Sequence, residues 1–296
     1  MRLPHEALVE AQAVVDRLRR EQLPVCMLRP QMFSLEACSA AMAQVRERLE
    51  RGIGMAVLER LPVERWSEYE LRALYWLLGS LLSQPVAQEA SGLIFRDILD
   101  EGEDHEFGNA LAVTNRVLNF HTDNSGNRTR PDYISLMCLR RALHGGESQY
   151  CSVYSVYNAL AEQAPEALER LFRPFLHDRQ GIQPEGEREL LRAPALEWDG
   201  ERLRGRFSLN KISQGYRKAG MEMDAAAHAA LDALVSCIDR EQLSCQFMIE
   251  PGQVQYINNL QGLHHRSDYQ DGSDPQQRRH MVRMWYRNAG SAFFEG

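Results

Sequence analysis

The chain has 296 residues, and its 34 lysines and arginines against 41 aspartates and glutamates give a formal net charge of −7. Apolar residues make up 44% and charged residues 25%, which is the composition of an ordinary globular protein. The acidic balance offers no basic face for nucleic acid and disfavours binding to an anionic membrane surface. We therefore expect a small molecule as the partner, with no nucleic acid and no membrane, and the sequence leaves homo-oligomer formation open.

The N-terminal segment and the cysteines predict a cytoplasmic protein. Glu6, Glu10 and Asp16 interrupt the apolar residues of the first turns, so the segment lacks the apolar run of a secretory signal peptide. The six cysteines are scattered without a CxxC pair, which is typical of reduced, mostly buried thiols.

The first 85 residues are predicted to be mostly helical. Apolar residues recur near a period of 3.6 between Ala7 and Leu18, and again over 35–49. Ser67 and Glu70 form a capping-box pattern ahead of a third apolar helix. With no repeat and no linker, we expect one domain over 1–296, whose core spans 86–296.

From residue 86 onward the pattern changes to short apolar runs separated by glycine, aspartate and asparagine. Two helices are expected, Val156–Phe172 with a break at Pro165, and Asp224–Asp239. Many short strands with long connections favour an antiparallel barrel or jelly roll with flanking helices, hence an α+β protein. The predicted strands are Ser91–Leu99, Tyr133–Leu139, Gln149–Ser152, Arg202–Leu209, Cys245–Ile249, Gln253–Ile257 and Met281–Arg287.

Two histidine-containing segments could bind a metal ion. In an extended chain His121 and Asp123 point to the same face and could occupy adjacent positions on a metal. A histidine from the pair His264 and His265 could complete two histidines and one carboxylate, the facial triad of non-haem iron oxygenases. Adjacent residues project in different directions, so only one of the pair is expected to bind. Taken singly, each segment also fits a histidine that has only a structural role.

Two further segments could bind an anion or close a turn. Arg283, in the segment Arg278–Arg287, shares a strand face with Met281 and Trp285, so its guanidinium would need an anionic partner. That partner could be a ligand carboxylate held by two hydrogen bonds, or a carboxylate of the protein. The segment that ends at Ser148, His-Gly-Gly-Glu-Ser, could simply close a hairpin.

Together, and in this order, the four segments resemble the TauD/TfdA family of Fe(II)- and 2-oxoglutarate-dependent dioxygenases. The resemblance covers about residues 115–290 and implies a double-stranded β-helix, the jelly-roll core of cupin-like proteins. It implies that His121, Asp123 and His264 bind Fe(II) and that Ser148 and Arg283 contact 2-oxoglutarate.

In that family the enzyme hydroxylates an unactivated C–H bond with O2 and releases succinate and CO2. A carboxylate at Asp123, where halogenating relatives have a small residue, favours hydroxylation. The predicted substrate is an amino acid or another small acid, and desaturation or cyclisation stays open as the outcome.

Asn119, Asn124 and Arg206 are the predicted substrate-binding residues. Each also fits a role at the solvated surface, since polar residues in loops and on exposed strand faces are common. Two other functions compete with the oxygenase. One is a non-catalytic metabolite-binding member of the same fold, and the other is a zinc hydrolase that uses His121, Asp123 and His264.

Overall fold

The computed structural model describes residues 1–100, 102, 114–274 and 277–296. Its helices are α1 (His5–Arg20), α2 (Glu36–Arg51), α3 (Glu68–Leu82), α4 (Val153–Gln163), α5 (Pro165–Leu171), α6 (Leu209–Ala219) and α7 (Ala225–Ile238), with short 3-10 turns at Val25–Met27 and Pro30–Met32. No helix in the described residues has the length and apolar character needed to cross a membrane.

Two antiparallel sheets form the centre of the molecule, and three two-stranded ribbons lie beside them. The larger sheet has the order β1-β13-β5-β16-β2, with β3 also paired to β16, and the smaller has the order β12-β7-β14-β4. The larger sheet comprises β1 (Met55–Leu58), β2 (Gln84–Val86), β3 (Arg96–Ile98), β5 (Tyr133–Arg140), β13 (Val254–Asn258) and β16 (His280–Arg287). The smaller comprises β4 (Leu118–His121), β7 (Ser148–Ser152), β12 (Ser244–Phe247) and β14 (Gly262–Arg266). The ribbons pair β6 (His144–Gly145) with β15 (Tyr269–Gln270), β8 (Pro174–Asp178) with β9 (Leu190–Pro194), and β10 (Leu196–Trp198) with β11 (Leu203–Gly205).

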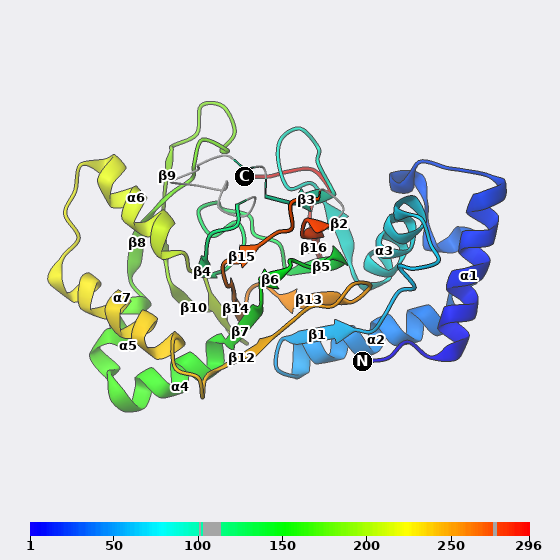
Figure 1. Cartoon of the computed structure of the whole chain (residues 1–296). Helices are drawn as coiled ribbons and strands as arrows, with labels where there is room; N and C mark the ends of the chain where they lie inside the picture. The colour runs from blue at the N-terminus through cyan, green and yellow to red at the C-terminus, as the bar shows by residue number, and fades with distance from the viewer. Residues whose placement is uncertain (101, 103–113, 275–276) are drawn as a thin grey trace.

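This architecture is the expected α+β jelly roll. In Figure 1, α1, α2 and α3 lie together on one side of the strands, while α4 to α7 lie on the other. The first helical group packs on the larger sheet, where Val282, Met284 and Tyr286 of β16 belong to its core. The second group packs around Phe120 and Leu263 of the smaller sheet. Both sheets therefore have one face covered by helices.

Several predicted boundaries are confirmed by local chemistry. Ser67 caps α3, and its side chain and that of Glu70 form both hydrogen bonds of a capping box. Pro165 occupies the first turn of α5, where its missing N–H is tolerated, and so divides the predicted helix into α4 and α5. Asp224 caps α7 by accepting a hydrogen bond from the backbone N–H of Ala227.

Two predicted strands are much shorter than expected. Of Ser91–Leu99, only Arg96–Ile98 pairs with a neighbour. Of Arg202–Leu209, only Leu203–Gly205 is a strand, and the chain then enters α6 with Ser208 as its N-cap. The Ser208 hydroxyl accepts from the backbone N–H of Lys211, which begins a helix where alternation predicted a strand.

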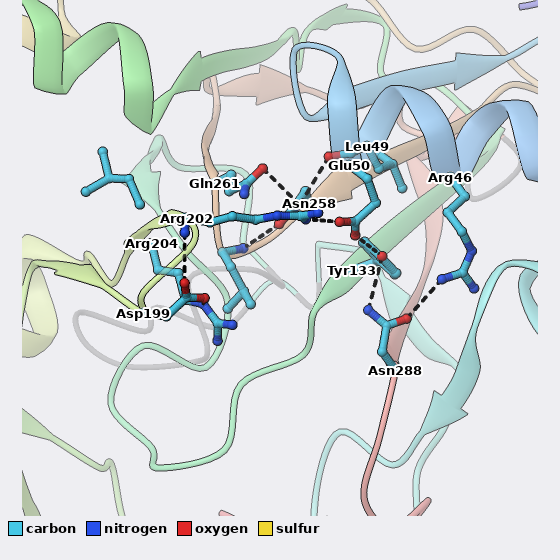
Figure 2. Close-up of polar contacts among 12 residues, drawn as sticks. Arg46, Leu49, Glu50, Tyr133, Asp199, Arg202, Arg204, Asn258, Gln261 and Asn288 are labelled. Atoms are coloured by element: carbon cyan, nitrogen blue, oxygen red, sulfur yellow. Dashed lines mark hydrogen bonds and ion pairs between the residues drawn. The ribbon is translucent and has the colours of Figure 1, made fainter.

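A polar network joins α2 to the sheet and to the ribbon of β10 and β11 (Figure 2). The Glu50 carboxylate accepts hydrogen bonds from the Tyr133 hydroxyl and the Arg202 guanidinium. The Asn258 amide donates to the carbonyl of Leu49 at 3.1 Å and so satisfies an acceptor at the end of α2. These bonds fix the first helical group against β5 and β13.

Candidate metal centre

His121, Asp123 and His264 come together between the two sheets. One donor atom from each side chain lies within 4.8 Å of the others. Asp123 Oδ1 is 3.4 Å from His121 Nε2 and 3.5 Å from His264 Nε2, and the two imidazole centroids are 4.2 Å apart. The structure thus brings together the three ligands that the sequence resemblance implies.

Strand register explains how two distant histidines meet. His121 of β4 is the direct antiparallel partner of His264 of β14, so their side chains leave the sheet on the same face. Their neighbours Phe120 and Leu263 point to the opposite face and pack among the helices. Alternation along the two strands therefore places the imidazoles on the face toward the larger sheet and the apolar side chains on the face covered by helices.

The same alternation separates His265 from the cluster. Its ring stacks on Phe120 with a centroid distance of 5.1 Å, on the helix-covered face of the smaller sheet. His265 is not a member of the metal-binding group formed by the described residues, whereas His264 is. Of the two histidines, His264 is the one that faces the cluster.

The two oxygens of Asp123 have different partners. Oδ1 faces both imidazoles, while Oδ2 accepts the indole N–H of Trp285 at 2.7 Å and lies 3.1 Å from Arg283 Nη1. Burial alone would raise the pKa of this carboxyl, but Arg283 and the two imidazoles hold it well below its usual range. Asp123 is therefore an anion with one oxygen held by donors and the other directed at the histidines.

The backbone around Asp123 is held by Asn259, a residue that follows β13. Asn259 Oδ1 accepts the N–H of Asp123 at 2.7 Å, and its amide donates to the carbonyls of Asp123 and Pro131 at 3.1 Å each. Asn259 is fully buried, so these hydrogen bonds are shielded from water. Sequence reasoning assigned no role to Asn259, and the bond depends on a pairing that spans 136 residues.

The donor set fits a divalent metal ion of the first transition row. His121 Nδ1 donates to the carbonyl of Asn119 at 2.8 Å, which leaves Nε2 as the atom available to a metal ion. Burial lowers the pKa of His264 to about 4, with a further contribution from His121, so this imidazole is neutral at pH 7. Two imidazoles and one carboxylate form the facial arrangement found in non-haem iron oxygenases.

Two cavities meet at this cluster. The larger, of about 550 Å³, is bordered by β4, the start of α6 and the β16 residues Arg283 and Trp285. The smaller is bordered by Ser148, Arg266, Arg279 and Arg283 as well as by the three cluster residues. Arg283 therefore borders both cavities beside the same carboxylate.

The predicted substrate residues have separate positions. Asn119 and Asn124 line the larger cavity, although the Asn124 amide already donates to the carbonyl of Thr129 at 2.6 Å. Arg206 lies outside the residues that border either cavity, and its buried guanidinium donates to the carbonyls of Ser125 and Asn127. These contacts hold the loop after Asp123, and the substrate role of Arg206 stays a prediction.

Sequence reasoning also missed Arg279. Its side chain is buried at the smaller cavity, beside the ring of Tyr269, and its Nη1 atom has no hydrogen-bond partner in the described structure. Arg279 and Arg283 have the same parity along the chain, so alternation alone could not distinguish them.

Comparison with known proteins agrees with this fold. The family "Taurine catabolism dioxygenase TauD, TfdA family" matches residues 23–285. The chain belongs to this family of dioxygenases. It is 30% identical over 275 residues to FR-33289 synthase of Streptomyces rubellomurinus, a match that covers 91% of this chain and 79% of the relative. It is 28% identical to the taurine hydroxylase-like protein SAT17 of Stachybotrys chartarum, over 94% of this chain and 72% of that one.

Solved structures share the fold at lower identity. An asparagine oxygenase in complex with Fe(II), 2S,3S-3-hydroxyasparagine and succinate superposes with a TM-score of 0.72 at 19% identity, over 97% of this chain and 93% of its own. The non-haem iron oxygenase OrfP in complex with iron and alpha-ketoglutaric acid gives 0.71 at 18% identity, over 97% and 94%. The jelly-roll architecture expected from the sequence is thereby confirmed.

Proposed function

We propose that this protein is an Fe(II)- and 2-oxoglutarate-dependent oxygenase that hydroxylates an unactivated C–H bond of a small acid or amino acid. The observation that carries the proposal is the convergence of His121, Asp123 and His264, with Asp123 Oδ1 directed at both imidazoles. Family membership over residues 23–285 supports the same reaction class.

In this proposal His121, Asp123 and His264 would hold Fe(II), and the two cavities beside them would take the co-substrates. When bound, iron supplies the oxidation of a C–H bond at the expense of O2 and 2-oxoglutarate, with succinate and CO2 as products. Trp285 and Arg283 position the Asp123 carboxylate through Oδ2, so that Oδ1 stays oriented toward the imidazoles.

The smaller cavity is the proposed site for 2-oxoglutarate. Ser148 borders it with a hydroxyl group, as the sequence resemblance implies. Two arginines, Arg279 and Arg283, are candidates for binding the distal carboxylate of the co-substrate. Arg283 was the sequence-based choice, but its Nη1 atom already lies beside Asp123.

The contacts of Arg279 favour it for this role. Its guanidinium is buried with Nη1 unpaired, and a buried unpaired donor of a charged group is strongly disfavoured unless a ligand satisfies it. A carboxylate held by a guanidinium fork would satisfy that donor. We therefore assign the distal carboxylate to Arg279 and leave Arg283 between the two cavities, where it contacts Asp123.

The test is an anaerobic titration of the purified protein with Fe(II) and then 2-oxoglutarate, followed by the metal-to-ligand absorption band. Oxygen is then admitted, and succinate release is measured against a panel of amino acids and small acids. The proposal predicts a visible band and substrate-stimulated succinate release. Absence of iron binding, with the fold intact by circular dichroism, would overturn it.

A further inference from the structure

The larger cavity has a strongly cationic wall. Its described lining residues include four cations, Arg96, Lys211, Arg217 and Arg283, against a single carboxylate, that of Asp123. Asp123 belongs to the metal cluster, so no other described carboxylate lines this cavity. A wall with this charge favours an anionic ligand over a cationic one.

Lys211 differs from the other three cations. Arg283 lies beside Asp123, Arg96 is paired with Glu89, and Arg217 bonds Gln214. The Lys211 ammonium, by contrast, has no hydrogen bond or ion pair with any described residue. The residue is partly buried at the cavity wall. Burial lowers the pKa of Lys211 to about 8, with further lowering from Arg283 and Arg206 and raising by Asp123 and Asp178.

The nearby carboxylates are already occupied. Asp178 of β8 is 3.3 Å from Lys218 Nζ and accepts the backbone N–H of Gln180 at 2.9 Å. Asp123 has the partners described above. Because neither carboxylate is within ion-pair distance of Lys211, a structural ion pair does not account for this lysine.

The stem of Lys211 has a defined path. Gly126, in the loop after Asp123, has no side chain, and a Cβ built there would lie 3.2 Å from Lys211 Cδ and 2.4 Å from the carbonyl of Asp178. The methylene chain of Lys211 therefore passes close to Gly126, where a larger residue would not fit. The first turn of α6 borders the same cavity, and the positive end of its dipole adds to the favourable potential for an anion.

The distance between this lysine and the metal cluster is fixed by backbone contacts. Ser208, the N-cap of α6, forms an antiparallel bridge with His121. The N–H of Thr122 donates to the carbonyl of Phe207 at 2.8 Å, and the Thr122 hydroxyl accepts the N–H of Phe207 at 3.2 Å. The start of α6 is therefore attached directly to the segment that carries His121 and Asp123.

We propose that Lys211 binds the acidic group of the substrate, so that the substrate is a small organic acid whose oxyanion points toward the start of α6 and away from the metal cluster. The inference rests on the proposed function for the identity of the reaction, and it deepens that function by assigning a substrate class and a specificity residue. Carboxylate, sulfonate and phosphonate share the required chemistry, and the experiment distinguishes them.

The composition of the chain makes the test unusually direct. Of its 34 basic residues only two are lysines, Lys211 and Lys218. Protein labelled with [ε-13C]lysine therefore gives two lysine signals in a carbon–proton spectrum, and Lys218, which pairs with Asp178 and Glu189, is an internal control. Zn(II) replaces iron, and saturating 2-oxoglutarate occupies its own site, so that added acids report on the larger cavity.

Butanoate, ethanesulfonate and ethylphosphonate are titrated separately, with 1-butanol as the matched neutral probe. The proposal predicts that at least one acid shifts the Lys211 signal, raises the pH at which that signal titrates, and leaves the Lys218 signal in place. The acid with the lowest Kd identifies the oxyanion. If none of the acids moves the Lys211 signal, or if 1-butanol moves it equally, the proposal is overturned.

Variants separate a binding role from a structural one. Lys211→Met, which keeps the length of the side chain, should weaken binding of the preferred acid at least tenfold, while Lys211→Arg should restore part of it. Lys218→Met should leave the affinity unchanged. Equal affinities in Lys211→Met and wild type would contradict the proposal.

Failure of this inference is distinguishable from failure of the proposed function. If the protein binds iron and releases succinate in the presence of a substrate but the Lys211 signal does not respond, the anion-site proposal is rejected and the oxygenase proposal stands. If the Lys211 signal responds but the protein binds no iron, the anion-site proposal stands and the oxygenase proposal is rejected.

Discussion

Arg283 Nη1 lies 3.1 Å from Asp123 Oδ2, so the arginine expected to hold a co-substrate is already paired with a proposed metal ligand. The guanidinium also bonds Gln88 through Nε at 2.8 Å and stacks over Trp285, which bonds the same carboxylate oxygen. Arg283 is thus coupled to the metal cluster, which changes what its substitution should do.

We expect Arg279 and Arg283 to respond differently when they are replaced by lysine, which keeps the charge and loses the planar fork. Arg279→Lys should weaken 2-oxoglutarate binding by about 2–4 kcal/mol with little change in Fe(II) affinity, as for loss of a desolvated charge pair. Arg283→Lys should lower Fe(II) affinity as well, because it disturbs Asp123.

Titration of 2-oxoglutarate into Fe(II)-loaded protein, followed by the absorption band, measures the first effect, and anaerobic Fe(II) titration measures the second. If only Arg283→Lys loses 2-oxoglutarate affinity, Arg283 and not Arg279 binds the distal carboxylate, as the sequence alone suggested.

His264→Ala should abolish Fe(II) binding, whereas His265→Ala should retain it. The two residues are adjacent, but His264 faces Asp123 at 3.5 Å and His265 stacks on Phe120 on the other face of the sheet. Metal content after dialysis against Fe(II) under nitrogen is the measurement, and circular dichroism checks that both variants fold. Comparable iron content in the two variants would contradict the assignment of His264.

Asp123→Gly should lower Fe(II) affinity and eliminate hydroxylation while the jelly roll persists. The substitution removes one of three proposed ligands and leaves the Trp285 indole and the Arg283 guanidinium without their shared acceptor. A buried donor without a partner destabilises by about 1–3 kcal/mol, so the melting temperature should fall by several degrees. Turnover equal to wild type would show that Asp123 is no ligand.

Some of these site residues could be predicted from the sequence, and others could not. His121, Asp123 and His264 were predicted from the resemblance of their motifs to the family, and alternation explains why His121 and Asp123 could share a face. Arg279 and Arg283 share a parity, so only the pairing of Arg283 with Asp123 distinguishes them. Lys211 could not be found, because Arg202–Leu209 was expected to be a strand and α6 was missed.

The missed elements have a common physical cause. The long helices have apolar residues at helical spacing, and the strands β5, β13 and β16 bury nearly every side chain, so both were recognisable in the sequence. Strand β4 has four residues with a mixed burial pattern, and its conformation depends on β14, which is distant in the chain. Helix α6 contains Gly215, which lowers its intrinsic propensity but permits close packing on β8.

Gly215→Ala should therefore destabilise the protein, although alanine is the better helix former. A Cβ at this position would lie 2.4 Å from the carbonyl oxygen of Leu176 and 2.9 Å from the nitrogen of His177, both backbone atoms of β8. Overpacking of this kind costs about 1–3 kcal/mol, which exceeds the gain in helix propensity of about 1 kcal/mol. Urea denaturation is the measurement.

Ser236→Ala, on the exposed face of α7, is the control for Gly215→Ala and should not destabilise. Because α6 carries Lys211, Gly215→Ala should also weaken binding of the preferred acid. Unchanged stability and unchanged acid binding would show that α6 can move away from β8 freely.

The stability of the protein should fall as the pH drops below about 6.5, in part through His177. This imidazole is fully buried, and burial together with Arg206, Lys211 and Arg130 lowers its pKa to about 3, despite a hydrogen bond to the carbonyl of Ala193. The unfolded chain takes up the proton near pH 6.5, whereas the folded chain resists it until about pH 3.

The stabilising contribution of neutral His177 is therefore complete above pH 6.5 and is lost progressively between that value and about pH 3. His177→Leu removes the titrating group, so its free energy of unfolding should depend less steeply on pH across this window, even if its stability at pH 7.5 is lower. Urea denaturation at a series of pH values gives both slopes, with the exposed His228→Leu as the control for loss of a histidine. Parallel slopes in wild type and His177→Leu would show that His177 does not resist protonation in the folded state.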